Sequence, residues 1–249
     1  DTGRVAIATQ TAYVLTLFFD LITASQRKHV INDLVKKIHE DNDHLTTGFV
    51  GTPYLCPVLS ANNQHELATT IFLQQDFPSW IYEVKHGATT IWERWNSILP
   101  DGSMKPEGMN SLNHYSFGAI MAWAYKYVLG IKKHNAGFSK FVFAPQFDLR
   151  LKNIKGHYDT PYGDIEIEYH LQSGENQAVK INLEIPFGCE CKVVLPDSEN
   201  RDIKVNDQII QGEFNLKAGK YLITYAPNHD LMKCLNVNST LSKVILSNQ

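Results

Sequence analysis

The chain has 249 residues, 43% hydrophobic and 20% charged, which is the composition of a globular protein with a substantial core. The formal net charge of −3 provides no basic footprint and argues against nucleic acid as a partner. No apolar run reaches transmembrane length, because the apolar stretch at residues 12–22 is interrupted by Thr16 and Asp20, so no membrane-spanning segment is predicted.

The first part of the chain has helical periodicity. Residues 5–21 repeat apolar side chains at helical spacing (Ala8, Ala12, Leu15 and Phe19), and a second amphipathic helix is expected from Ser25. A loop at residues 46–53 follows, in which Pro53 is well placed to begin another helix. Further helices are expected at residues 64–74, from about residue 80 to Gly87, and at residues 111–129. The loops between these helices suit part of a helical toroid better than a closed bundle.

The periodicity changes from helical to alternating near residue 140. Residues 132–140 are a polar connector, and beyond them apolar and polar side chains alternate over residues 164–169, 179–185 and 189–195. Turn signals such as Pro186 separate these runs. We therefore predict part of a helical toroid at residues 1–140 and an antiparallel β-sandwich at residues 141–249.

The four cysteines are too few for a disulfide scaffold. Cys189 and Cys191 flank Glu190 in an alternating run, which places both side chains on one face of a strand. No second Cys or His pair accompanies them, so packed free thiols are expected and neither a metal nor a cofactor is predicted.

Residues 80–95 contain the most informative side chains. Trp80, Trp92 and Trp95 lie around Glu93 in the sequence, after a break at Gly87-Ala88. Aromatic faces suit the apolar face of a sugar ring, and a carboxylate among them suits proton transfer at a glycosidic bond. Composition alone favours a simpler interpretation, in which Glu93 pairs with Arg94 or faces water. The other acidic residues considered are expected at the surface: Asp76, Glu83, Glu107 and Asp159.

Four motifs then follow one another along the chain. They are Thr47–Leu55, Phe77–Trp80 together with Gly87–Trp95, Asn113–Ala119, and His157–Gly163. In this order they resemble loops of the bacterial α-L-rhamnosidases of glycoside hydrolase family 78, the last motif falling in the C-terminal β domain. The resemblance covers essentially the whole chain, and it implies an (α/α)6 six-hairpin toroid followed by a β-sandwich.

The resemblance also implies a reaction and residue roles. Enzymes of this family hydrolyse terminal α-L-rhamnosyl residues of oligosaccharides and glycosides with inversion. Glu93 matches the general base that deprotonates the attacking water, and His114 matches a histidine that contacts the bound rhamnose. Trp80 and Trp92 resemble aromatic positions at or near the pocket. Without the resemblance, His114 would be interpreted as a surface histidine of a helix.

One motif of the family is missing. The general acid belongs to an acidic motif beside a Gly-Trp pair, and no Gly-Trp pair occurs in this sequence. The chain, which also lacks an initiator Met, therefore resembles the C-terminal portion of such an enzyme and is predicted to be inactive alone. Its expected partner is the missing N-terminal part. The apolar face left by half a toroid predicts self-association or rearrangement. The sequence leaves a cytoplasmic or an exported location open.

Two other functions fit the same residues. In a non-catalytic carbohydrate-binding module, the three tryptophans would form an exposed stacking platform, whereas a general base requires a recessed Glu93. Another (α/α)6 glycosidase or a lyase would show similar carboxylates flanked by tryptophan. Whether Glu93 lines a concave pocket distinguishes the enzymes from the binding module.

Overall fold

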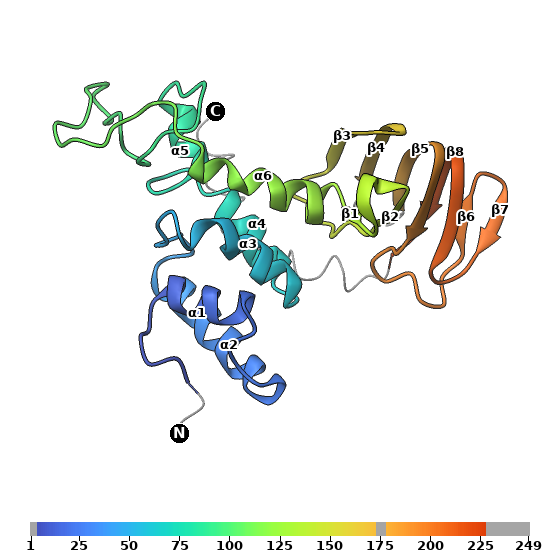
Figure 1. Cartoon of the computed structure of the whole chain (residues 1–249), viewed down its shortest axis with the longest axis horizontal. Coiled ribbons are helices and arrows are strands. Elements are labelled where there is room, and N and C mark those ends of the chain that lie inside the picture. Colours follow the sequence, from blue (N-terminus) through green and yellow to red (C-terminus); the bar gives the residue numbers. More distant parts are fainter. Residues whose placement is uncertain (1–3, 173–177, 228–249) are drawn as a thin grey trace. The chain divides into compact units, whose positions relative to one another are not determined.

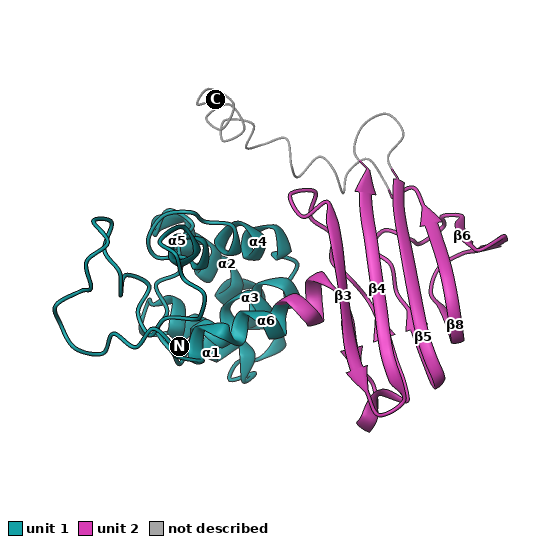
Figure 2. Ribbon diagram, turned by 90° about the horizontal axis from the view of Figure 1, so that it is seen from above, with its two compact units in different colours: residues 1–123 teal, residues 124–249 magenta. Residues whose placement is uncertain are grey.

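The computed structural model describes residues 4–172 and 178–227, and the chain divides into two compact units, residues 1–123 and 124–249 (Figure 2). The first unit is helical and the second is a β-sheet, in the predicted order (Figure 1). The division falls before residue 140 because residues 131–133 and 140–143 already form strands of the sheet. Residues 228–249 of the predicted β domain lie outside the described residues.

The described helices are mostly short and begin at recognisable caps. They are α1 (Gln10–Phe18), α2 (Ala24–Glu40), α3 (Thr52–Ala61), α4 (His65–Phe72), α5 (Trp80–Lys85) and α6 (Ile120–Trp123). Thr23 and Gln26 form a capping box at the start of α2, and Pro53 lies in the first turn of α3, as predicted. Within the described residues, no helix is both long and apolar enough to cross a bilayer.

Helix α1 buries a different face from the one that its sequence suggested. The buried side chains are Gln10, Tyr13, Val14 and Leu17, whereas Phe19 is 54% exposed. Gln10 turns this face inward because its amide nitrogen donates to Asp41 Oδ2 (2.8 Å) and to the His44 carbonyl (2.9 Å). In α2, by contrast, the predicted apolar side chains Val30, Leu34 and Ile38 are buried.

The helix predicted at residues 111–129 is shorter than its apolar pattern suggested. Helical structure begins with a 3₁₀ turn at Ser116–Ala119, continues as α6, and ends with a π-helical turn at Ala124–Val128. Residues 111–114 instead run beside residues 91–93, with Ser111 and His114 bonded to Glu93 and Ile91 through the backbone. Tertiary pairing therefore overrides the local helical propensity there.

Within its described residues, the second unit contains one hydrogen-bonded sheet of eight strands. They are β1 (Ile131–Lys133), β2 (Lys140–Phe143), β3 (Asn153–Thr160), β4 (Gly163–Gln172), β5 (Ala178–Val193), β6 (Ile203–Val205), β7 (Gln208–Ile210) and β8 (Phe214–Tyr225). The order is β1-β2-β5-β8-β6-β7, and β4 joins β5 to β3. The sheet is mostly antiparallel, as predicted, but β2 and β5 pair in parallel.

Strand β5 is the central element of this sheet. Residues 179–185 and 189–195 were expected as two strands separated at Pro186, but residues 178–193 form one strand with an irregular register between Ile185 and Glu190. Its first part pairs with β4, its last part pairs with β2, and both parts pair with β8. Cys189 and Cys191 are buried in the same core, on one face as predicted. A bulge in one long strand thus replaces the expected turn.

Candidate active site

The predicted site follows helix α5, whose two ends are well defined. The Ser79 hydroxyl accepts the Tyr82 N–H (3.0 Å) at the start of the helix. At the other end Gly87 has φ +84°, the Ala88 N–H donates to the Glu83 carbonyl (3.0 Å), and the Gly87 N–H donates to the Val84 carbonyl (3.0 Å). This is a Schellman cap, so the break predicted at Gly87 is confirmed and fixes the direction in which the next segment leaves.

The segment that carries Glu93 is held by a second segment twenty residues further on. The Glu93 N–H donates to the Ser111 carbonyl (2.9 Å), and the His114 N–H donates to the Ile91 carbonyl (2.8 Å). The Thr90 hydroxyl also donates to the Leu112 carbonyl. These bonds bring Glu93 and His114 onto neighbouring strands of backbone, so two of the predicted site residues lie in one local structure.

The carboxyl of Glu93 is half-buried and has a defined orientation. Its Oε2 accepts the Ser111 N–H at 3.0 Å, so the backbone pairing around Ser111 also fixes the side chain. Arg94 lies with its Nη1 3.9 Å from Glu107 Oε2. The side chain of Arg94 therefore engages a different carboxylate, which disagrees with the simple interpretation in which Glu93 pairs with Arg94.

His114 lies between two aromatic rings. Its ring stacks on Phe49 (centroids 4.8 Å apart, planes 13° apart) and on Tyr115 (5.4 Å, 8°). Its Nδ1 accepts the Ser116 N–H at 3.3 Å, so in the neutral ring the proton lies on Nε2. His114 thus offers Nε2–H as a donor, with its plane held by the stacking.

The tryptophans of the site are interior residues. Trp80, Trp92 and Trp95 are 7%, 3% and 8% exposed. The Trp80 indole N–H donates to the Phe117 carbonyl (3.0 Å), and Trp95 stacks on Phe117 with centroids 4.0 Å apart. The three indole rings are therefore packed beneath the segment that carries Glu93, and they do not provide an exposed stacking platform.

The sequence did not identify the aromatic rings that are exposed near His114. Tyr115 is 87% exposed and Phe49 is 38% exposed. Both belong to motifs of the family resemblance, Phe49 to residues 47–55 and Tyr115 to residues 113–119, and this membership was the only signal that could have identified them. They offer the open aromatic faces that the buried tryptophans lack.

Glu83 is not the surface residue expected from the sequence. It is 2% exposed, and burial raises the pKa of its carboxyl to about 8. Its Oε2 accepts the backbone N–H of Trp92 at 3.4 Å. Glu83 follows Trp80 by three positions and so shares its face of the helix, but the sequence does not show that this face is covered.

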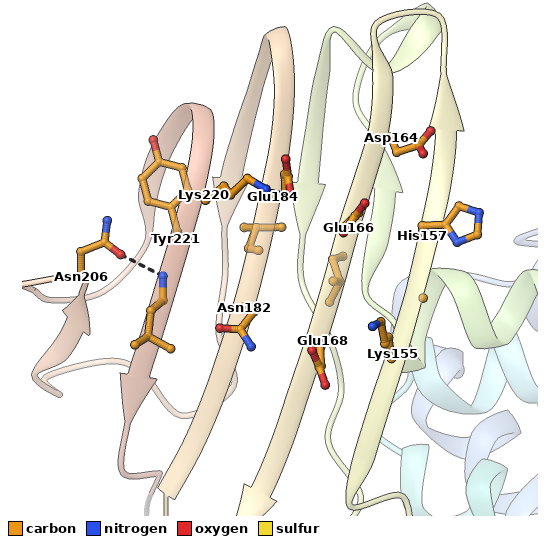
Figure 3. Close-up of a pocket in the computed structure, with 14 residues that line it drawn as sticks. Lys155, His157, Asp164, Glu166, Glu168, Asn182, Glu184, Asn206, Lys220 and Tyr221 are labelled. Atoms are coloured by element: carbon orange, nitrogen blue, oxygen red, sulfur yellow. Dashed lines mark hydrogen bonds and ion pairs between the residues drawn. The ribbon is translucent and has the colours of Figure 1, made fainter.

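A concave region lies in the β unit. A groove of about 880 Å³ crosses the outward side of β3, β4, β5 and β8, as Figure 3 shows. His157, Glu166, Glu184 and Lys220 form one row across these strands, and Lys220 Nζ lies 2.8 Å from Glu184 Oε2. Such pairing of opposite charges is typical of the solvated side of a sheet. None of the predicted site residues lines this groove.

In the described part of the chain, no group of three His, Cys, Asp or Glu side chains could hold a metal ion.

The structure thus combines a helical unit, in which an oriented carboxylate lies near a histidine and open aromatic rings, with a mostly antiparallel β unit. The family model of the bacterial alpha-L-rhamnosidase six-hairpin glycosidase domain matches residues 1–128, and that of the bacterial alpha-L-rhamnosidase C-terminal domain matches residues 130–210. The chain belongs to the bacterial α-L-rhamnosidase family.

Individual relatives agree with this assignment. An alpha-L-rhamnosidase of Alteromonas sp. (strain LOR) is 36% identical over 86% of this chain and 23% of its own length. The crystal structure of the Streptomyces avermitilis alpha-L-rhamnosidase complexed with L-rhamnose matches with a TM-score of 0.77 and 31% identity, over 87% of this chain and 21% of that one. The Aspergillus terreus α-L-rhamnosidase matches with a TM-score of 0.81 and 28% identity, over 90% and 25%. The chain thus spans about a quarter or less of these relatives and corresponds to their C-terminal part.

Proposed function

We propose that this chain is the C-terminal portion of an inverting α-L-rhamnosidase, in which Glu93 is the general base for hydrolysis of terminal α-L-rhamnosyl residues. The observation that carries the proposal is the fixed Glu93 carboxyl, half-buried beside the His114 segment and held by the Ser111 N–H. One oxygen of this carboxylate accepts that N–H, and the other oxygen is the one assigned to water. A carboxylate held in this way can remove a proton as water attacks the anomeric carbon.

The substrate contacts belong to His114 and the rings beside it. His114 Nε2–H donates to a rhamnose hydroxyl, and the exposed ring of Tyr115 offers a face to the apolar side of the sugar. Trp80 and Trp92, which the family resemblance placed at or near the pocket, act from beneath by packing, because both are buried. The substrate is a rhamnosylated oligosaccharide or glycoside.

The general acid comes from the N-terminal part of the enzyme, outside this chain. An inverting site requires a second carboxyl about 6.5–9.5 Å from the base, to protonate the leaving oxygen while a water fits between the two. The chain by itself therefore binds sugar weakly and hydrolyses it little. The buried indoles disfavour the carbohydrate-binding module, because they expose no platform.

The test is Glu93→Gln in the complete enzyme, assayed on an aryl α-L-rhamnoside. Loss of the base should lower kcat about 10²–10⁴-fold. Azide, a nucleophile from which no proton has to be removed, should restore part of the turnover. Nuclear magnetic resonance of the first-formed product should show the β anomer with the wild type. Glu107→Gln is the matched control, because Glu107 is exposed and pairs with Lys105 (3.0 Å). Near-wild-type turnover of Glu93→Gln would remove Glu93 from the chemistry.

A further inference from the structure

Glu83 lies on the opposite side of the Glu93 segment from Ser111 and His114. Successive backbone groups of an extended segment point in opposite directions. The Ile91 carbonyl and the Glu93 N–H point towards Ser111 and His114, and the N–H of Trp92 between them points towards Glu83. The segment is therefore held from two sides, with Glu83 as the acceptor on the interior side.

Glu83 is attached to this segment at two places. Its backbone carbonyl accepts the Ala88 N–H where the segment leaves helix α5, and its side-chain Oε2 accepts the Trp92 N–H four residues later. The residue after Trp92 is the proposed base. We propose that Glu83 is a positioning residue for Glu93, and that it holds residues 88–93 against helix α5 through these two contacts. The inference rests on the role of Glu93 given above.

The surroundings of Glu83 make this attachment dependent on pH. Within the described residues its Oε1 has no hydrogen-bond partner, and the bond to Trp92 is long, so little stabilises a charge there. The charged and titratable groups of α5 and of the loops beside it have other partners: Lys85 with Gln75, His86 with the Tyr82 carbonyl, Glu93 with the Ser111 N–H, Arg94 and Lys105 with Glu107, Asp101 with Ser103, and His114 with the Ser116 N–H.

Ionisation of Glu83 consequently places an uncompensated charge in the interior. Burial raises the pKa of Glu83 to about 8, so the carboxyl is uncharged at neutral pH. Above that pH the charge can be hydrated only if the segment over it moves away. The position of Glu93 is then lost together with the Trp92 contact. Glu83 thus makes the order of residues 88–93 fall as pH rises towards 8, because the open segment lets the carboxyl ionise.

Hydrogen exchange of the 249-residue chain, measured from pH 6 to pH 9.5, tests the inference directly. After correction for the intrinsic exchange rate, protection of the Trp92 amide in the wild type should fall about tenfold for each pH unit between pH 6 and pH 8, and it should level off above pH 8. Glu83→Gln keeps an acceptor oxygen and cannot ionise, so its protection should stay constant over the range. Glu83→Leu offers no acceptor and should lose protection at every pH. Residues 30–38 of α2 serve as the internal reference.

Two results would overturn the inference. One is wild-type protection at Trp92 that follows the α2 reference through pH 9.5, and the other is a Glu83→Leu chain that protects Trp92 as well as the wild type does. In the complete enzyme at pH 7, Glu83→Leu should lower kcat about tenfold, and Glu83→Gln should retain it. Equal turnover of Glu83→Leu and wild type would contradict the positioning role. The exchange measurement does not depend on activity, so the two proposals can fail separately. Exchange can refute the positioning role of Glu83 while Glu93→Gln supports the base, and exchange can support that role while Glu93→Gln refutes the base.

Discussion

Glu83 and Glu93 are ten residues apart, yet the fold gives their carboxyls opposite surroundings. Glu93 is half-buried and accepts the Ser111 N–H at 3.0 Å, which suits a charged group. Glu83 is 2% exposed and accepts one long hydrogen bond from Trp92. These different environments suit the two roles proposed above, Glu93 as the base that takes a proton from water and Glu83 as a positioning residue in its uncharged form.

The stability of the chain should therefore depend on pH through Glu83. The pKa of this carboxyl is raised from 4.5 to about 8 by burial, so between these values the folded state binds more protons than the unfolded state. Its contribution to the free energy of unfolding is complete below about pH 4.5 and is lost as pH rises to about 8. The loss is up to about 1.4 kcal/mol per pH unit. Urea unfolding at pH 5, 6.5 and 8 should show that Glu83→Gln flattens this decline.

Glu107→Gln provides a control of opposite sign. The hydrogen bond and charge of Lys105 lower the pKa of Glu107, so its contribution is present above the unfolded pKa and is lost as pH falls through the folded one. In the Glu107→Gln variant, the free energy of unfolding should decline between pH 5 and pH 8 as it does in the wild type. If Glu83→Gln and wild type decline in parallel over that range, the uncharged state assigned to Glu83 is wrong.

At the scale of elements, the connection from the last helical turn into the sheet depends on Gly130. Gly130 has φ +88°, and its carbonyl accepts the Ala144 N–H at 2.8 Å. A Cβ at this position would lie 2.5 Å from the backbone nitrogen of Pro145, a contact that no side-chain rotation can relieve. Gly130→Ala should lower the free energy of unfolding of the β unit by about 2–4 kcal/mol, measured by urea denaturation.

The Gly212→Ala variant measures the cost of the left-handed backbone conformation without a steric clash of the new Cβ. Gly212 also has positive φ (+69°), but nothing lies within 4 Å of the position of its Cβ. The substitution should cost about 1 kcal/mol or less, from the left-handed conformation alone. A Gly130→Ala variant no less stable than Gly212→Ala would show that the approach of Pro145 is less close than the structure indicates.

The elements that the sequence predicted well are those whose signals are local. Gly87 ended helix α5, and Pro53 began α3, because a left-handed residue and a fixed φ act within a few positions. The helix predicted for residues 111–115 does not form, because this segment pairs with residues 91–93. The periodicity of the sequence does not reveal such a partner. Pro186 predicts a turn, because the residue types at an irregularity within a long strand are the same as those at a turn between two strands.

For the site, ordered motifs identified Glu93 and His114, and the structure brings their segments together. Motifs could not say which aromatic rings are exposed. Trp80 and Trp92 are buried, whereas Tyr115 and Phe49 are exposed, and this difference depends on tertiary packing. The burial of Glu83 likewise depends on what covers helix α5, which no pattern along one helix specifies.

At the scale of the whole molecule, the C-terminal end of helix α1 presents an exposed apolar face. Tyr13, Val14 and Leu17 of the helix are buried, but Phe18, the C-cap residue Phe19 and Leu21 beyond it are 44%, 54% and 70% exposed. Phe18 and Phe19 cluster with Tyr54, the closest pair of rings being Phe18 and Tyr54 with centroids 4.2 Å apart. Exposed apolar patches of this kind often mark a surface that is covered in a larger assembly. In the complete enzyme, we infer that other helices of the toroid cover this face.

The isolated chain should associate with itself through this exposed face of α1. An exposed aromatic cluster continuous with Leu21 is a surface that a second copy can cover by removing apolar area from water. Light scattering should show a mass that rises with concentration, and Phe19→Ser with Leu21→Ser should bring it towards 28.2 kDa. Phe187→Ser is the matched control, since Phe187 is 91% exposed but belongs to the β unit and not to the unit that carries this cluster. This variant should associate as the wild type does. A wild-type chain that stays monomeric at all concentrations, or a double variant that associates equally, would contradict the assignment of this face.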